Sequence, residues 1–85
     1  ASITNRFNKK IVNRNGYLLR QGDICRDLAF VSKGCVRLYY LKDDVEISVW
    51  FSYQGTSAIE IYSFIRESPS NYFIQAIEDT EVLYL

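Results

Sequence analysis

The chain has 85 residues, of which 48% are apolar and 15% aromatic, and its ten basic and ten acidic residues cancel. A chain of this length forms one small domain with a modest core, because it buries only about 60–65% of its unfolded surface, and a deep enclosed enzyme cavity is not expected. The zero net charge excludes an overall positive field of the kind that drives binding to DNA phosphates.

The N-terminal region begins with a polar, mixed segment at residues 1–13, which we interpret as a lead-in to the domain. It ends in a first short strand that includes Ile11 and Val12. An apolar run at residues 17–20 follows Gly16 and is predicted to be the second strand, because turn-forming residues lie on both sides of it.

Two further apolar runs, at residues 28–31 and 35–41, are separated by a polar turn that contains Gly34. Glycine adopts left-handed or tight turn conformations without the steric cost that other residues have. We therefore expect the second run to return antiparallel to the first.

The segment at residues 46–51 alternates apolar and other side chains after a polar turn at 42–45, which predicts a hairpin with the preceding strand. In this alternation Trp50 faces outward, toward a second sheet or a partner. The expected core consists of inward-facing residues of this hairpin and of the last two strands: Val36, Leu38, Ile47, Val49, Phe51, Ile74 and Leu83. The aromatic residues of the hairpin are expected to pack within the fold rather than to stack on nucleic-acid bases: Tyr39, Tyr40, Trp50 and Tyr53.

A short helix is predicted at residues 57–66, because Ile61, Phe64 and Ile65 lie at helical spacing. Ser57 is the expected N-cap, and Glu60 then completes a capping box three residues later. Pro69 lies in the loop that ends the helix. Two final strands are expected at residues 72–77 and 81–85, with a turn at 78–80.

Signatures of enzymes and of metal sites are absent from the sequence. There is no histidine, no nucleotide-binding glycine motif and no pair of residues spaced for acid–base catalysis, so we expect no enzymatic activity. Cys25 and Cys35 are interpreted as free, partly buried thiols of a reducing compartment. Because the chain lacks methionine and any secretion or membrane-spanning signal, we interpret it as part of a longer, cytoplasmic protein.

The run Phe-Val-Ser-Lys-Gly-Cys-Val-Arg-Leu-Tyr-Tyr at residues 30–40, placed behind Gln-Gly-Asp at 21–23, resembles a known sensor domain. It is similar to the cyclic-nucleotide-binding β-roll of the Crp/Fnr family of transcription regulators, and the resemblance extends from Gly16 to Leu85. It implies a mainly β fold, a double-stranded β-roll of jelly-roll type, with the one short helix in the position of the phosphate-binding cassette. Residues 1–85 are then a single effector domain without the dimerisation helix and the DNA-binding helix-turn-helix of that family.

The resemblance also implies where a ligand would bind. In the family a glutamate of Gly-Glu-Leu binds the ribose, and an arginine ten residues later binds the cyclic phosphate. The matching glutamate here is Glu60, but Ile59 replaces the glycine and Ser70 replaces the arginine. The ligand-binding residues implied by this match are Ile59, Glu60, Ser70 and Asn71.

The loss of the arginine removes the charge-assisted contacts that the family makes to phosphate. Arg66 is the one nearby cation that could replace it, although a position at the end of the helix suits interaction with the helix dipole and with water. We therefore expect weak binding of cyclic AMP or none, and the effector is a cyclic nucleotide or another small molecule.

The function that follows is a ligand-sensing regulatory domain of a Crp/Fnr-like regulator. DNA would be bound only by a region outside this chain, and the longer protein would act as a homodimer with no membrane association. The alternatives are a regulatory or ligand-free scaffold domain of a kinase, channel or other protein, and a small cupin-like enzyme, which the lack of histidine disfavours.

Overall fold

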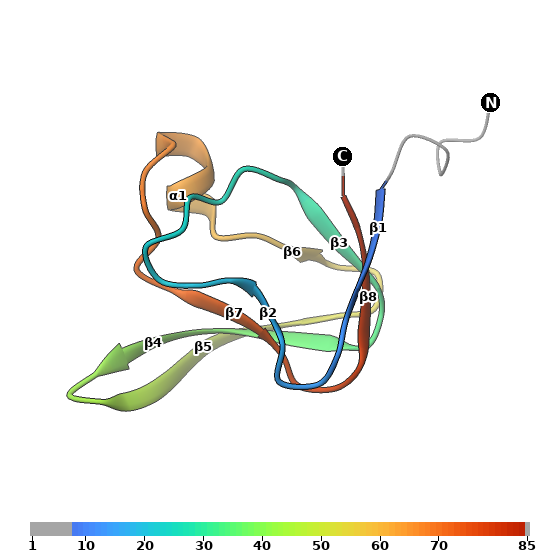
Figure 1. The fold of residues 1–85 in the computed structure, drawn as a ribbon, viewed down its shortest axis with the longest axis horizontal. Helices are drawn as coiled ribbons and strands as arrows, with labels where there is room; N and C mark the ends of the chain where they lie inside the picture. The colour runs from blue at the N-terminus through green and yellow to red at the C-terminus, as the bar shows by residue number, and fades with distance from the viewer. Residues whose placement is uncertain (1–7, 85) are drawn as a thin grey trace.

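The computed structural model describes residues 8–84, which form two four-stranded antiparallel sheets and one short helix (Figure 1). The strand order is β1-β8-β3-β6 in the first sheet and β2-β7-β4-β5 in the second. The elements in chain order are β1 (Asn8–Val12), β2 (Tyr17–Leu19), β3 (Ala29–Lys33), β4 (Cys35–Lys42), β5 (Val45–Tyr53), β6 (Ser57–Ala58), α1 (Ile61–Arg66), β7 (Phe73–Ala76) and β8 (Thr80–Tyr84). The predicted mainly β fold with one short helix is therefore confirmed.

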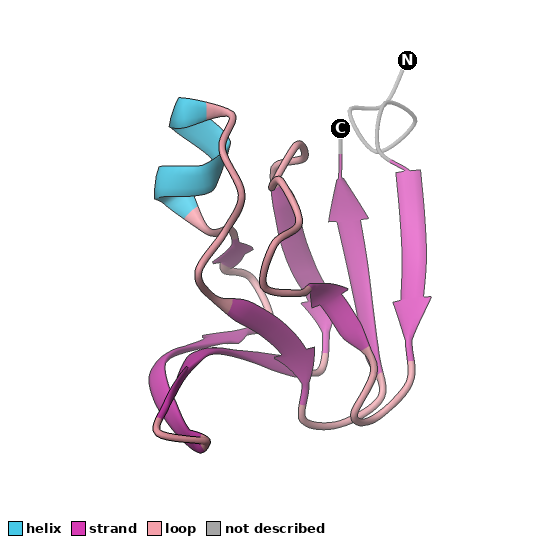
Figure 2. Cartoon of the chain, turned by 60° about the vertical axis from the view of Figure 1, so that its left-hand side comes forward, coloured by secondary structure: helices cyan, strands magenta, loops and turns pink. Residues whose placement is uncertain are grey.

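The helix lies beyond the ends of the strands, beside the space between the two sheets (Figure 2). The predicted strands at 17–20, 28–31, 72–77 and 81–85 are all present with small shifts of their ends. Of the predicted lead-in at residues 1–13, positions 8–12 form β1, which pairs with β8. Residues 1–7 and Leu85 lie outside the described residues. Within residues 8–84 no helix is both long and apolar enough to cross a membrane.

The expected antiparallel pairing across Gly34 is wrong. β3 pairs with β6 and β8, whereas β4 pairs with β5 and β7, so Gly34 carries the chain from one sheet to the other. Its φ of +92° lies in the left-handed region, and a Cβ there would lie 2.5 Å from the hydroxyl oxygen of Thr80. The glycine is required for this close passage and not for a hairpin turn.

The β4–β5 hairpin is confirmed, and its turn uses two residues with positive φ, Asp43 at 52° and Asp44 at 65°. Such left-handed pairs match the twist of a two-residue hairpin. The register shifts between Leu38, which faces Trp50, and Tyr39, which faces Ser48. Val49 is the extra residue of this bulge.

Because of the bulge, the set of β5 side chains that faces the core is not the set expected from the alternation. Residues that face one another across two strands share a side of the sheet, and Ser52 faces the buried Val36. Trp50 and Ser52, which follow the bulge along β5, are therefore on the core side. Val49 and Phe51, expected in the core, are instead 45% and 40% exposed.

The core lies between the two sheets and includes the expected Val36 and Ile74. Leu38 is half-buried against this core. Ile47 and Leu83 are half-buried but lie outside the core cluster, so the prediction is wrong for these two: Leu83 is on the side of its sheet opposite the buried Val82, where it faces Lys9 and Phe30. The buried apolar residues of the cluster are Val12, Leu19, Cys25, Ala29, Val31, Val36, Ala58, Ile74, Ala76 and Val82.

A second, aromatic cluster lies around Tyr39, which is only 2% exposed. Its ring stacks on Phe73 with 4.8 Å between centroids, and its hydroxyl lies 2.9 Å from that of Tyr17. The guanidinium of Arg37 covers the ring at 4.1 Å. Burial raises the pKa of the Tyr39 hydroxyl above its ordinary value, so this group stays protonated.

Of the four hairpin aromatics expected to pack, two do so. Tyr39 is buried, and Tyr40 is half-buried and makes an edge-to-face contact with Tyr72. Trp50 and Tyr53 are 64% and 60% exposed, so the packing prediction is wrong for these two residues.

Candidate functional site

The segment that includes the predicted site starts with β6 and continues into α1. Ser57 is not the N-cap, because it lies in β6 opposite Phe30. The N-cap is Glu60, whose carboxylate accepts hydrogen bonds from the backbone N–H of Tyr62 at 3.1 Å and of Ser63 at 3.0 Å. Glu60 is only 3% exposed. A capping role for this carboxylate was expected, but it is performed from the N-cap position and without a capping box.

The helix ends at Glu67, which adopts the left-handed conformation and donates its backbone N–H to the carbonyl of Ser63. The side-chain hydroxyl of Ser63 donates to the Ser68 carbonyl at 2.6 Å and accepts the Cys25 N–H at 2.7 Å. Ser63 is 1% exposed, and it thereby fixes the helix both to its following loop and to the segment before β3.

The loop after the helix is held by Ser70. Its backbone N–H donates to the Asp23 carbonyl at 2.8 Å, and its carbonyl accepts from Gly22 at 2.9 Å. Its hydroxyl accepts from the N–H of Tyr72 at 2.9 Å and also contacts the Tyr72 carbonyl at 3.2 Å. Ser70 is 2% exposed, so its polar atoms are engaged within the protein.

The four predicted site residues do not converge on one pocket. Glu60 and the exposed Asn71 line a shallow polar depression, which also contains Arg66. Ile59 lines a different cavity, and Ser70 is buried below the surface. Arg66 is exposed, at the end of the helix as expected, with its guanidinium 5.7 Å from the Tyr62 ring.

The cavity that Ile59 lines has a volume of about 290 Å³ and lies between the β4–β5 hairpin and the β6–α1 segment. We call it the cassette cleft. Its walls contain no charged residue, and Ser52, one of its two serines, already donates a hydrogen bond to the Ser57 carbonyl at 2.8 Å. The lining residues are Val36, Leu38, Trp50, Ser52, Ser57, Ala58, Ile59, Ile61 and Ile74.

Trp50 is the cleft residue that sequence reasoning placed on the wrong face. The alternation along β5, taken alone, predicted that the more apolar set of side chains, Ile47, Val49 and Phe51, faces the core. The signal that could have corrected it is the register with β4, in which Trp50 faces Leu38. That register depends on the bulge, which a single strand pattern does not reveal.

Both cysteines are buried free thiols, as predicted. Burial raises the pKa of each thiol above its ordinary value. No group of three or more metal-ligating side chains occurs within residues 8–84.

Comparison with known proteins places this geometry in a family. The family model described as cyclic nucleotide-binding domain matches residues 9–85. No curated protein sequence matches the chain.

Solved structures resemble the chain closely in fold. The catabolite activator protein of Thermus thermophilus is 25% identical with a TM-score of 0.84, and the match covers 96% of this chain and 38% of that one. The CO-dependent transcription factor CooA of Carboxydothermus hydrogenoformans is 26% identical with a TM-score of 0.73, over 95% of this chain and 34% of that one.

A third structure, the EAL enzyme Bd1971, is 19% identical with a TM-score of 0.81, over 93% of this chain and 70% of that one, and this likeness concerns the fold alone. The family match and the two facing antiparallel sheets with one helix confirm the expected β-roll. The chain belongs to the cyclic nucleotide-binding domain family.

Proposed function

We propose that this domain is the effector-sensing part of a Crp/Fnr-like transcription regulator and that its effector is not cyclic AMP. Likeness to the Thermus catabolite activator protein and to CooA supports the regulator. The cassette cleft supports the second half of the proposal, because none of its lining residues is charged.

The central observation is the state of Ser70, which the family resemblance matches to the phosphate-binding arginine. It is 2% exposed and its hydroxyl is hydrogen-bonded to the backbone of Tyr72. Each charge-assisted hydrogen bond to a phosphate contributes about 1.5–3 kcal/mol. Arg66 does not replace the missing cation in the cleft, since it lines the separate depression with Glu60.

The mechanism we propose is a shift between two conformations of the longer protein. An effector in the cassette cleft contacts α1 through Ile61 and the hairpin through Trp50. A ligand that binds one arrangement of these elements more tightly than the other shifts the equilibrium by that difference in affinity. The downstream helix would transmit the shift to the DNA-binding region.

DNA recognition would belong to the longer protein, acting as a cytoplasmic homodimer on paired half-sites. The only described helix has six residues, and the net charge of the chain is zero. A gel-shift experiment at matched salt tests the proposal. We expect specific binding by the longer protein and none by residues 1–85 alone. Absence of specific binding by the longer protein would contradict the regulator, and specific binding by this chain would contradict the domain assignment.

The alternative is a regulatory or scaffold domain of an enzyme, kinase or channel, which the similar fold within the EAL enzyme Bd1971 favours. The residues that follow Leu85 in the gene discriminate the two functions. A long amphipathic helix and a helix-turn-helix would indicate the regulator, whereas a catalytic or membrane domain would indicate the alternative.

A further inference from the structure

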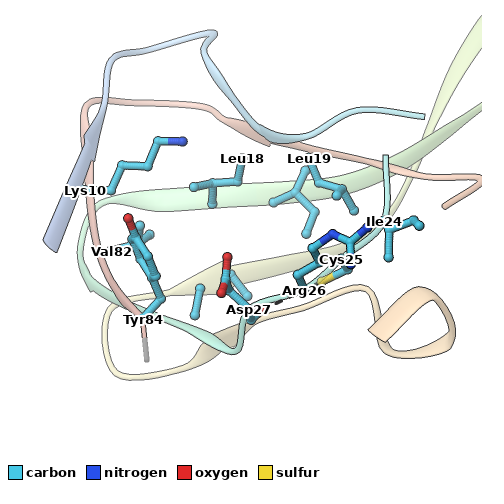
Figure 3. Close-up of a pocket in the computed structure, with 12 residues that line it drawn as sticks. Lys10, Leu18, Leu19, Ile24, Cys25, Arg26, Asp27, Val82 and Tyr84 are labelled. Carbon is cyan, nitrogen blue, oxygen red and sulfur yellow. Dashed lines mark hydrogen bonds between the residues drawn. The ribbon is translucent and has the colours of Figure 1, made fainter. Parts of the chain in front are cut away.

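A second cavity, of about 210 Å³, lies between the two sheets on the side of β1, β2 and the 24–27 segment (Figure 3). We call it the roll cavity. Its apolar wall comes from both sheets and includes Leu18, Leu19, Ala29, Ala58, Ile74 and Val82. A concave apolar site with a few polar groups is typical of small-molecule binding sites.

Three charged side chains, Lys10, Arg26 and Asp27, also line this cavity. Figure 3 shows the ammonium of Lys10 and the carboxylate of Asp27 extending from opposite sides into the space between the sheets. The ion pairs of residues 8–84 join Lys9 to Glu81 and Arg37 to Glu46, so none of the three is paired. They also make no side-chain hydrogen bond within this part of the chain, and all three are exposed, so they line the open side of the cavity.

This combination of charges selects among ligands. A simple fatty acid would match Lys10 but would be repelled by Asp27. An apolar amine would match Asp27 and leave the two cations without a partner. A ligand that has one carboxylate and one ammonium beside an apolar group satisfies both signs and the apolar wall.

We propose that the roll cavity binds a free α-amino acid with an apolar side chain of about the size of leucine. Its carboxylate faces Lys10, its ammonium faces Asp27, and its side chain contacts Leu18 and Ile74. This site is separate from the cassette cleft and does not depend on the function proposed for that cleft.

The volume sets the size of the ligand. An apolar cavity of about 150 Å³ holds benzene. In proportion, the roll cavity of about 210 Å³ holds roughly eight heavy atoms. Leucine has about nine, of which the charged groups lie at the mouth, whereas tryptophan has about fifteen and is too large by the same comparison.

The test is a calorimetric titration of the 85-residue chain with L-leucine, 4-methylpentanoate, which lacks the ammonium, and 3-methylbutylamine, which lacks the carboxylate. We expect L-leucine to bind with a Kd on the order of 0.1–1 mM. Each single-charge analogue should bind about tenfold or more weakly, because it loses charge-assisted contacts. Equal binding of leucine and either analogue, or no saturable binding of leucine below about 10 mM, would overturn the proposal.

Two substitutions at the rim, Lys10→Gln and Asp27→Asn, should each weaken leucine binding by about tenfold. Both side chains are exposed, so the fold should persist. The matched controls are Lys9→Gln, whose ammonium pairs with Glu81 at 3.8 Å, and Asp43→Asn in the hairpin turn. The controls should bind leucine as the wild type does. Unchanged binding in the two rim variants would contradict the proposed site.

Discussion

The cassette cleft and the roll cavity share two core residues, Ala58 and Ile74, yet they differ in chemistry. The cleft has no charged wall residue, while the roll cavity has three charges among its lining residues. The strands therefore supply a common apolar interior, and the charged residues at one of its two sides distinguish the two spaces. The cassette side has Ser70 where the family resemblance leads us to expect a cation, and the charged residues line the other side of the core.

Truncating Ile74, the larger of the two shared residues, should have the largest effect on both spaces. Ile74 is 4% exposed, and Ile74→Ala should lower the free energy of unfolding by about 2–5 kcal/mol, since it creates a cavity in the core. Ile74→Val should cost about 0.5–1.5 kcal/mol and retain the fold. Urea unfolding measures both changes.

The matched control for this comparison is Ile65→Ala, since Ile65 is 70% exposed on α1. This change should alter stability by less than about 0.5 kcal/mol. A loss for Ile74→Ala no larger than that of Ile65→Ala would contradict the view that Ile74 supports the wall of both spaces.

A smaller effect, confined to the cassette side, is expected for Glu60→Ala. The substitution leaves the N–H groups of Tyr62 and Ser63 without their acceptor, and loss of an N-cap costs about 0.5–2 kcal/mol. Urea unfolding measures the loss, with Glu78→Ala in an exposed turn as the control. Leucine affinity should not change in Glu60→Ala. A stability equal to that of the wild type would show that the cap contributes nothing.

The reactivity of the two cysteines compares the roll cavity with the rest of the core without a change in stability. Because burial raises the pKa of each thiol, both remain protonated near pH 7, and alkylation should be slow and accelerate as the pH rises. Cys25 lines the roll cavity, whereas Cys35 does not. Leucine at ten times its Kd should slow alkylation of Cys25 by on the order of tenfold and leave Cys35 unchanged.

Peptide mass spectrometry measures the two rates separately. Equal protection of both thiols would indicate that leucine stabilises the whole domain and does not cover Cys25. Protection of neither thiol, at a concentration where calorimetry detects binding, would place the ligand elsewhere.

The sequence was sufficient to predict every strand except β6, the single short helix and the family resemblance, because period-two patterns and turn residues are local signals. The residues of β6 were expected to begin the helix. It was insufficient where long-range pairing decides. The passage of Gly34 between sheets depends on which distant strands pair with β3 and β4. The exposed Phe51 results from a bulge whose position only the register reveals.

Within the site, the capping function of Glu60 was predictable from a carboxylate near the start of the helix. Its position as N-cap was not, because the sequence does not reveal that Ser57 pairs with β3. The roll cavity could not be predicted at all. Lys10 and Asp27 lie on segments that come together only through the pairing of β1 and β3 with β8.

The most direct test of the central claim is a calorimetric titration of the chain with cyclic AMP, with the EAL enzyme Bd1971, described in a cyclic AMP-bound form, as the positive control. We expect no saturable binding below about 1 mM, because loss of two charge-assisted contacts weakens binding by roughly 10²–10⁴-fold. A micromolar or tighter Kd would contradict the claim, and loss of that binding in Arg66→Gln would identify the replacement cation.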